Sequence, residues 1–243
     1  MLLSVGMLLV ACIFPLFTFF FLRKGHKDDP AYRKDCRNLL LNGMLLGFPV
    51  FGFSLLCDLL FLLTGLGEKY PIVRLVFRTF VLMAFSEELM KHLCAGKIIR
   101  KNRVAVSCLD VIAYTAIAAV GFELMESVIY LFYSDPAQIL VRGVTNMHAA
   151  FGLIQGFLLS RGYRKNRKAP HVLAVLIPTI IHGLYDFGLD QQMIDTGWGD
   201  LSLLIAVFCL VLNIVAIFRI RKARKDPGLT CPLFAEEASD SPA

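Results

Sequence analysis

Long runs of apolar residues alternate with short polar segments along almost the whole chain. A helix of about 20 apolar residues crosses the hydrocarbon core of a bilayer. Runs of that length lie at 1–22, 39–63, 72–96, 104–132, 137–160, 171–189 and 200–218. The pattern therefore predicts an all-α fold, a polytopic transmembrane helix bundle of about seven spans.

Composition agrees with a membrane-embedded chain. Hydrophobic residues make up 57% of the 243 residues and charged residues 18%, and the mean hydropathy is +0.65. A bilayer solvates such a surface, whereas a soluble domain of this size would leave much of it in water. No basic residue precedes the first apolar run, so we expect a retained helix and no cleaved signal peptide. The seven cysteines form no C-x-x-C pair and are expected to be reduced.

Basic residues gather in every second connection. Twenty of the 25 Lys and Arg residues lie in the segments 23–38, 97–103, 161–170 and 219–225. Because basic loops stay in the cytoplasm, this predicts an outer N-terminus and an inner C-terminus. Membrane orientation and contact with anionic lipid account for the net charge of +6. We therefore expect the lipid bilayer as a partner and no nucleic acid.

Ionisable side chains inside apolar runs are candidates for function, because each costs about 2.5–3.5 kcal/mol at the centre of a helix by insertion scales. The third run holds Glu87 and Glu88, followed by Lys91. On a helix one ammonium reaches either carboxylate but cannot neutralise both at once. This leaves one carboxylate suited to act as a general base. The alternative is a salt bridge at the helix end, with Lys91 extending to the cytoplasm.

The fourth run carries a second acidic pair. Glu123 and Glu126 are three residues apart and share a helix face, next to Phe122. A catalytic role and interhelical pairing with Arg78 or Arg142 are both open for this pair.

Two histidines occupy the fifth and sixth runs. His148 forms one helical stripe with Gly152 and Gly156, and glycines there allow a neighbouring helix to approach closely. His182 lies one turn before Asp186, so the carboxylate can orient the imidazole.

The depth of these groups in the membrane follows from the helical rise of 1.5 Å per residue. Counted from the basic end of each run, Glu87, His148 and His182 all lie at about 15–21 Å. They should therefore meet near the midplane. Glu123, at about 30 Å by the same count, is expected at the outer edge of a shared cavity.

The order of these motifs on successive runs resembles the PrsW family, over about residues 80–190. The motifs are Glu87-Glu88-x-x-Lys91, Phe122-x-x-x-Glu126, His148-x-x-x-Gly152 and His182-x-x-x-Asp186. PrsW proteins are bacterial intramembrane proteases related to the type II CAAX prenyl endopeptidases of the ABI superfamily. The resemblance implies a glutamic intramembrane protease, and the best-known role in the family is the first cleavage of a membrane-anchored anti-sigma factor. Ser127 stands where the family pattern has Asn.

The resemblance also implies site residues and roles. Glu87 and Glu88 would be the catalytic carboxylates, and His148 and His182 catalytic or oxyanion-stabilising groups. Peptide hydrolysis needs an activated water, a stabilised oxyanion and a proton for the leaving amine. We expect Glu87 to deprotonate a water that His148 helps to position, and His182 to donate to the oxyanion. The residues expected to support them are Lys91, Asp186, Phe122, Glu123 and Glu126.

The chain is thus expected to be a multi-pass protein of the cell membrane, the bacterial cytoplasmic membrane, acting on a membrane-anchored protein substrate. We expect no cofactor and no metal ligand. Residues 1–225 should form one transmembrane domain with a catalytic core at about 72–190. Residues 226–243 should form a disordered cytoplasmic tail.

Three other functions stay open on the sequence. Two histidines and several carboxylates could form a zinc peptidase site, although no H-E-x-x-H motif is present. Buried Glu, His and Asp side chains also serve as proton relays in transporters, but we find no inverted repeat of the kind many transporters have. A non-catalytic membrane scaffold that keeps the ABI fold is the third possibility.

Overall fold

The structure is a computed structural model that describes residues 2–26, 28–102, 106–132, 136–190, 193 and 196–226. This part of the chain is helical and contains no strand, so the all-α fold is confirmed. In chain order its elements are α1 (Leu2–Ala11), α2 (Ile13–Arg23), the 3-10 helix η1 (Lys24–His26), α3 (Pro30–Thr64), α4 (Leu66–Lys69), α5 (Pro71–Val76), the π-helix η2 (Phe77–Phe85), α6 (Ser86–Lys101), α7 (Cys108–Tyr130), α8 (Pro136–Thr145), α9 (Met147–Lys165), α10 (Ala169–Leu189) and α11 (Gly197–Ala223). From residue 227 onward, the tail expected to be disordered lies outside the described residues.

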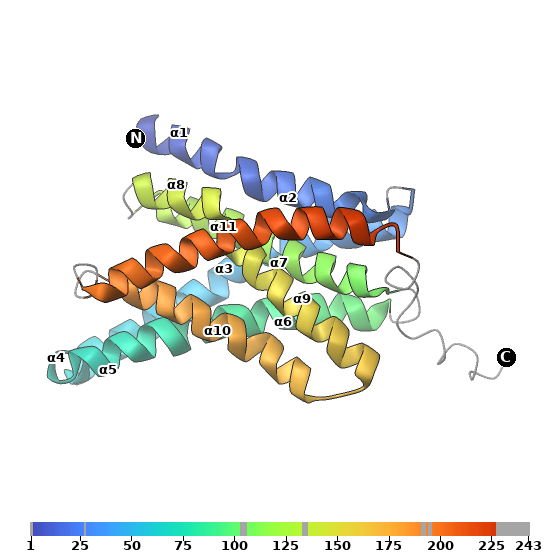
Figure 1. Cartoon of the computed structure of the whole chain (residues 1–243). Coiled ribbons are helices and arrows are strands. Elements are labelled where there is room, and N and C mark those ends of the chain that lie inside the picture. Colours follow the sequence, from blue (N-terminus) through green and yellow to red (C-terminus); the bar gives the residue numbers. More distant parts are fainter. Residues whose placement is uncertain are drawn as a thin grey trace.

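The long helices run side by side as a bundle (Figure 1). The segments that are long and apolar enough to cross a membrane are Val5–His26, Pro30–Thr64, Cys108–Tyr130, Ala169–Leu189 and Gly197–Ala223. The runs expected at 72–96 and 137–160 correspond to α5–η2–α6 and α8–α9, which are interrupted helices. The five segments indicate a multi-pass membrane protein, while the count of seven spans and their orientation stay predictions.

Helix α7 forms the centre of the bundle, with most of its side chains buried against α9, α3, α6 and α2. A capping box fixes its start, because Ser107 and Asp110 each accept a backbone N–H from the other. Small residues let the neighbours come close. Gly43 of α3 lies against Gly121 of α7, and a Cβ at Gly152 of α9 would lie 2.7 Å from the Cα of Ala116. The close approach expected for the glycine stripe of the fifth run is therefore present.

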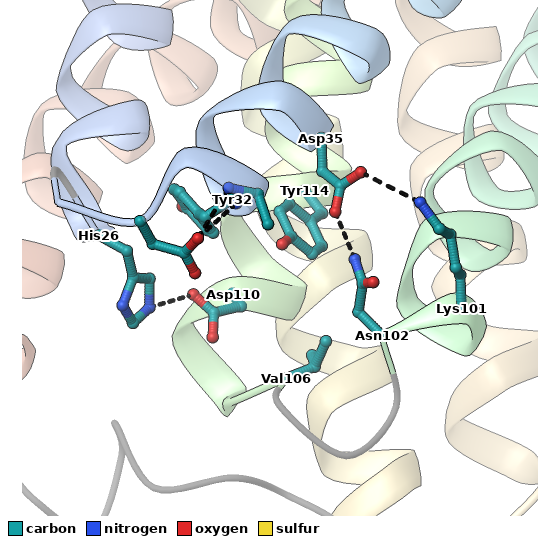
Figure 2. Close-up of a pocket in the computed structure, with 10 residues that line it drawn as sticks. His26, Tyr32, Asp35, Lys101, Asn102, Val106, Asp110 and Tyr114 are labelled. Atoms are coloured by element: carbon teal, nitrogen blue, oxygen red, sulfur yellow. Dashed lines mark hydrogen bonds and ion pairs between the residues drawn. The ribbon is translucent and has the colours of Figure 1, made fainter.

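Polar contacts tie the helix ends together where the basic segments gather (Figure 2). The imidazole of His26, at the end of η1, lies 2.8 Å from the carboxylate of Asp110 on α7. Asp35 of α3 accepts a hydrogen bond of 2.5 Å from Asn102 and lies 3.8 Å from the ammonium of Lys101. These contacts join connections that the sequence predicts on the same, cytoplasmic side.

A break in the middle of the fold separates α8 from α9. Asn146 lies there in the left-handed region with φ of 48°, a conformation that Asn tolerates better than most residues. The side-chain amide of Asn213 on α11 donates to the carbonyls of Thr145 and Asn146, at 3.0 and 2.8 Å. The amide of Asn146 donates to the hydroxyl of Thr18 at 2.9 Å. The backbone carbonyls at the break are thus satisfied inside the protein, as a membrane interior requires.

The contact between α3 and α7 depends on Gly121. A Cβ added there would meet the carbonyl oxygen of Leu40 and the Cα of Gly43, which are rigid backbone atoms. Gly121→Ala should therefore lower the free energy of unfolding by about 1–3 kcal/mol, as overpacking commonly does. Thermal unfolding of the purified protein in detergent micelles measures the change. Gly52→Ala is the control, since nothing lies within 4 Å of that position, and equal melting temperatures for the two variants would contradict the prediction.

Candidate active site

Two acidic side chains begin α6, directly after the π-helix η2. Glu87 and Glu88 are 3% and 0% exposed, so both carboxyl groups lie inside the protein. The wider turn of a π-helix is rare and is often found at functional sites. It ends at Phe85, and the ordinary α-helix that follows turns both acids into the bundle.

The ammonium of Lys91 neutralises mainly one of these acids. Its Nζ lies 2.8 Å from Oε1 of Glu88 and 3.5 Å from Oε2 of Glu87. It also lies over the ring of Phe122, 4.3 Å from the centroid. Because Lys91 is only 1% exposed, a salt bridge that extends to the cytoplasm does not describe it.

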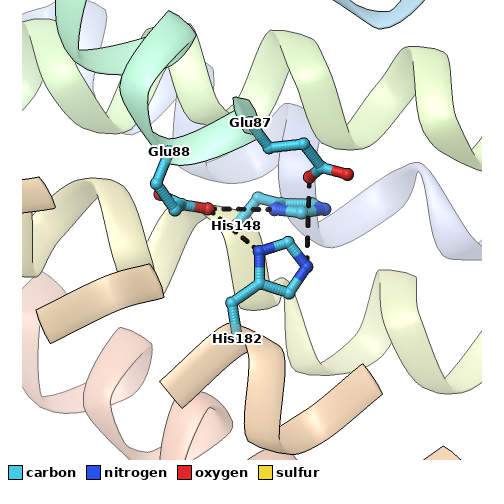
Figure 3. A group of neighbouring side chains, drawn as sticks. All are labelled: Glu87, Glu88, His148 and His182. Carbon is cyan, nitrogen blue, oxygen red and sulfur yellow. Dashed lines mark hydrogen bonds and ion pairs between the residues drawn. The ribbon is translucent and has the colours of Figure 1, made fainter. Parts of the chain in front are cut away.

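Two histidines complete the cluster (Figure 3). Their rings lie between Glu87 and Glu88, with centroids 5.1 Å apart. Nδ1 of His182 is 3.2 Å from Glu88, while its Nε2 is 3.2 Å from Asp186 and 3.9 Å from Glu87. Both nitrogens of His182 face carboxylate oxygens, so this ring can donate a hydrogen bond from either side.

Both ring nitrogens of His148 face charged side chains. Lys91 donates to Nδ1 at 2.8 Å, and because an ammonium has no acceptor, Nδ1 must be the acceptor of that bond. Nε2 lies 2.5 Å from the carboxylate of Glu126 and 3.0 Å from the guanidinium of Arg142. His148 is fully buried, and both of its nitrogens are engaged by protein groups.

The second acidic pair lies at the same level as the cluster. Glu126 pairs with Arg142 of α8 as well as with His148, and Glu123 accepts a hydrogen bond of 3.3 Å from the backbone N–H of His148. Glu123 is fully enclosed, so its expected position at the outer edge of the cavity is wrong. The reason is that α7 begins only at Cys108, which puts Glu123 about 22 Å from the helix start.

Interhelical pairing, which the sequence left open for these acids, is present for Glu126. Its partner is Arg142, whereas Arg78 pairs with Asp58, 3.4 Å away.

Gln155 belongs to the cluster too, since its amide donates to the backbone carbonyl and to the carboxylate of Glu88, each at 3.0 Å. Gln155 follows His148 by seven residues, or two turns, and this spacing was a signal that could have found it.

A small pocket reaches the cluster from the side. Its volume is about 50 Å³, and Glu87 and Glu126 are among the residues that line it. We call it the α3–η2–α7 pocket, because its other walls include Val50, Phe51 and Ser54 of α3, Met83 of η2 and Ile129 of α7.

The donor set also fits a divalent metal. Glu87, Glu88, His148 and His182 each offer a ligand atom, and these four atoms lie within 4.8 Å of one another. Two imidazole nitrogens and carboxylate oxygens are the donors of many zinc sites. The ammonium of Lys91 contacts Glu88 and His148, two residues of this set, so a metal would compete with it there.

Comparison with known proteins identifies the family. A family model described as PrsW family intramembrane metalloprotease matches residues 37–217. Protease PrsW of Halalkalibacterium halodurans is 31% identical over 230 residues, which cover 90% of this chain and 97% of that protein. The chain belongs to the PrsW family.

Further relatives carry the same name at lower identity. Protease PrsW of Clostridioides difficile is 28% identical over 72% of this chain and 77% of the relative. The protein of that name from Oceanobacillus iheyensis is 24% identical over 73% of this chain and 81% of the relative. No solved structure gives a significant match. The chain is thus a multi-pass membrane protein and an intramembrane protease.

The buried pair of Arg142 and Glu126 should be essential for stability. Arg142→Met leaves the Glu126 carboxylate without its guanidinium partner, and breaking a buried pair in this way costs about 3–5 kcal/mol. Thermal unfolding in detergent micelles measures the loss, and adding Glu126→Gln should recover part of it. Arg78→Met serves as control, because that side chain is 46% exposed and exposed pairs contribute about 0–1 kcal/mol. Equal losses for the two arginine variants would argue against the prediction.

Proposed function

We propose that this protease hydrolyses a peptide bond of a membrane-anchored protein with a water that Glu87 activates. The observation that carries the proposal is the difference between the two acids of α6. Glu88 is engaged by Lys91, His182 and Gln155 and has no exposed surface. Glu87 lines the α3–η2–α7 pocket and has the more distant contact with Lys91. A base must reach the proton that it removes, and Glu87 is the acid with that access.

The proposed reaction needs one proton carrier. Glu87 takes a proton from water as the water oxygen forms a bond to the carbonyl carbon of the scissile peptide. The tetrahedral intermediate collapses when the carbon–nitrogen bond breaks, and Glu87 returns the same proton to the leaving nitrogen. Positioned acid–base groups of this kind contribute on the order of 10²–10⁴-fold in rate.

The negative charge that develops on the carbonyl oxygen needs a hydrogen-bond donor to stabilise it. His182 meets this need in our proposal, because Glu88 holds its Nδ1 at 3.2 Å and leaves Nε2 to donate. Nε2 lies 3.9 Å from Glu87 and 3.2 Å from Asp186, whose oxygen makes no hydrogen bond there. A donor that is oriented before the reaction stabilises an oxyanion without reorganisation.

His148 acts through its neighbours in this proposal. A role in positioning water requires a ring nitrogen that faces the water, and both nitrogens of His148 have protein partners. We therefore propose His148 as a positioning residue that holds Lys91 against Glu88 and holds Glu126 beside Arg142.

A metal-assisted reaction is the second candidate, and the closeness of the four donor atoms favours it. In that case Glu87, Glu88, His148 and His182 would hold a divalent metal, whose chemistry is to polarise the carbonyl and acidify water. Asp186 would then orient His182 as an outer-sphere partner.

The substrate and location complete the proposal. By likeness to its family, we propose an anti-sigma-factor-like substrate with a single span, cut in the bacterial cytoplasmic membrane. We further propose that residues 1–225 form one transmembrane domain, with the catalytic core at about 72–190.

Glu87→Gln should abolish cleavage, because an amide cannot accept the proton from water. Comparative proteomics of membranes from wild-type and variant cells measures this as accumulation of an uncleaved membrane-anchored protein. Glu68→Gln is the matched control, since Glu68 is exposed on α4, and it should behave like wild type. Cleavage that continues in a folded Glu87→Gln protein at the wild-type rate would refute the assignment.

Chelation separates the two candidate mechanisms. With a Glu87-activated water and no metal, the purified protein should keep its cleavage rate after dialysis against a strong chelator, with metal content below one equivalent by mass spectrometry. A rate that falls with the metal content and returns when zinc is added would instead support the metal-assisted reaction.

A further inference from the structure

The α3–η2–α7 pocket joins the proposed base to the outside of the bundle. Glu87 and Glu126 line it and supply its carboxylates. The walls around them are mainly apolar, with Val50 and Phe51 on one side and Met83 on the other. A peptide whose side chain entered here would bring its backbone next to Glu87.

The mouth of this pocket faces hydrocarbon. Phe51 stands at the mouth and is 40% exposed. On the same helix, Phe48 and Leu55 are 59% and 54% exposed, and this part of α3 belongs to a segment that is long and apolar enough to span a membrane. Exposed apolar side chains at this depth contact lipid, so the pocket opens sideways into the bilayer.

The size of the pocket limits what can enter. A cavity of about 150 Å³ lined by apolar side chains admits a benzene molecule. The α3–η2–α7 pocket has a volume of about 50 Å³, which is too small for a phenyl ring and suits a small aliphatic side chain. Met83 and Phe51 form the apolar walls that set this limit.

We propose that the α3–η2–α7 pocket is the subsite for the substrate residue next to the scissile bond, and that it selects a small aliphatic side chain arriving from the lipid phase. The occupant is therefore a membrane-embedded segment of the protein substrate. This inference rests on the proposed function, since a scissile bond lies beside the pocket only if hydrolysis takes place at Glu87.

Enlarging the pocket tests the selection by size. The probe is the protein that accumulates in Glu87→Gln membranes, with Ala, Val, Leu or Phe placed on each side of its cleavage site. Wild type should cut the Ala and Val forms at least tenfold faster than the Phe form, because misfits in a hydrophobic pocket cost 10–200-fold. Met83→Ala should raise cleavage of the Phe form at least tenfold.

Met90→Ala is the matched control, because Met90 is also half-buried but lies outside the pocket. It should keep the wild-type order of substrates. A wild-type enzyme that cuts the Phe form as fast as the Ala form would overturn the subsite, as would equal behaviour of the two methionine variants. Both results leave peptide hydrolysis intact, whereas equal cleavage by wild type and Glu87→Gln would remove the proposed function and the subsite together.

Blocking the mouth tests the route of entry. Ser54→Trp adds a large ring at the pocket and should reduce cleavage of the Ala form at least tenfold. Leu55→Trp adds the same ring at the next residue, which is exposed to lipid, and should leave the rate unchanged. Melting temperatures check that both proteins are folded. Full activity in a folded Ser54→Trp protein would exclude entry through this mouth.

Discussion

The ammonium of Lys91 is enclosed where three helices meet, and its contacts determine how those helices fit together. It lies against Glu88 of its own helix, His148 of α9 and the ring of Phe122 on α7. Glu88 in turn brings in α10 through His182. In a medium of low dielectric constant each of these charges is costly without its partner, so a shift of one helix would leave a buried charge unpaired. The same contacts that stabilise the bundle therefore align the side chains of the site.

The interruption between α8 and α9 follows from this requirement. A continuous helix through residue 146 would use the backbone N–H of His148 within its own ladder, whereas the break leaves that group to donate to Glu123. The break also turns Arg142 toward Glu126. Asn213, far along the chain, satisfies the carbonyls that the break exposes. One structural irregularity thus provides partners for both acids of α7.

Much of this arrangement could be predicted, because it depends on local patterns. Apolar run length predicted the helices, and the helical rise placed Glu87, His148 and His182 at one depth, where they meet. The depth count was wrong for Glu123, since it assumed a helix that starts before Cys108. The bond between Asn213 and the break joins residues 67 and 68 positions apart, and no local pattern relates them. The α3–η2–α7 pocket depends on how three helices pack, which the order of residues alone does not fix.

The charges in the cluster do not balance, and this imbalance connects its chemistry with its position. In the described part of the chain, the cluster contains five carboxyl groups, those of Glu87, Glu88, Glu123, Glu126 and Asp186, and two basic groups, those of Lys91 and Arg142. Protons on carboxyl or imidazole groups, or a divalent metal, must supply the difference, because unpaired charges in this environment are too costly. Such a cluster takes up a proton from water readily, and it attracts cations for the same reason. Both candidate mechanisms therefore compensate the same excess of negative charge in the cluster. The affinity of the acids for protons and cations is high only where bulk water does not screen their charge. A base of this kind therefore works best behind an opening that faces lipid.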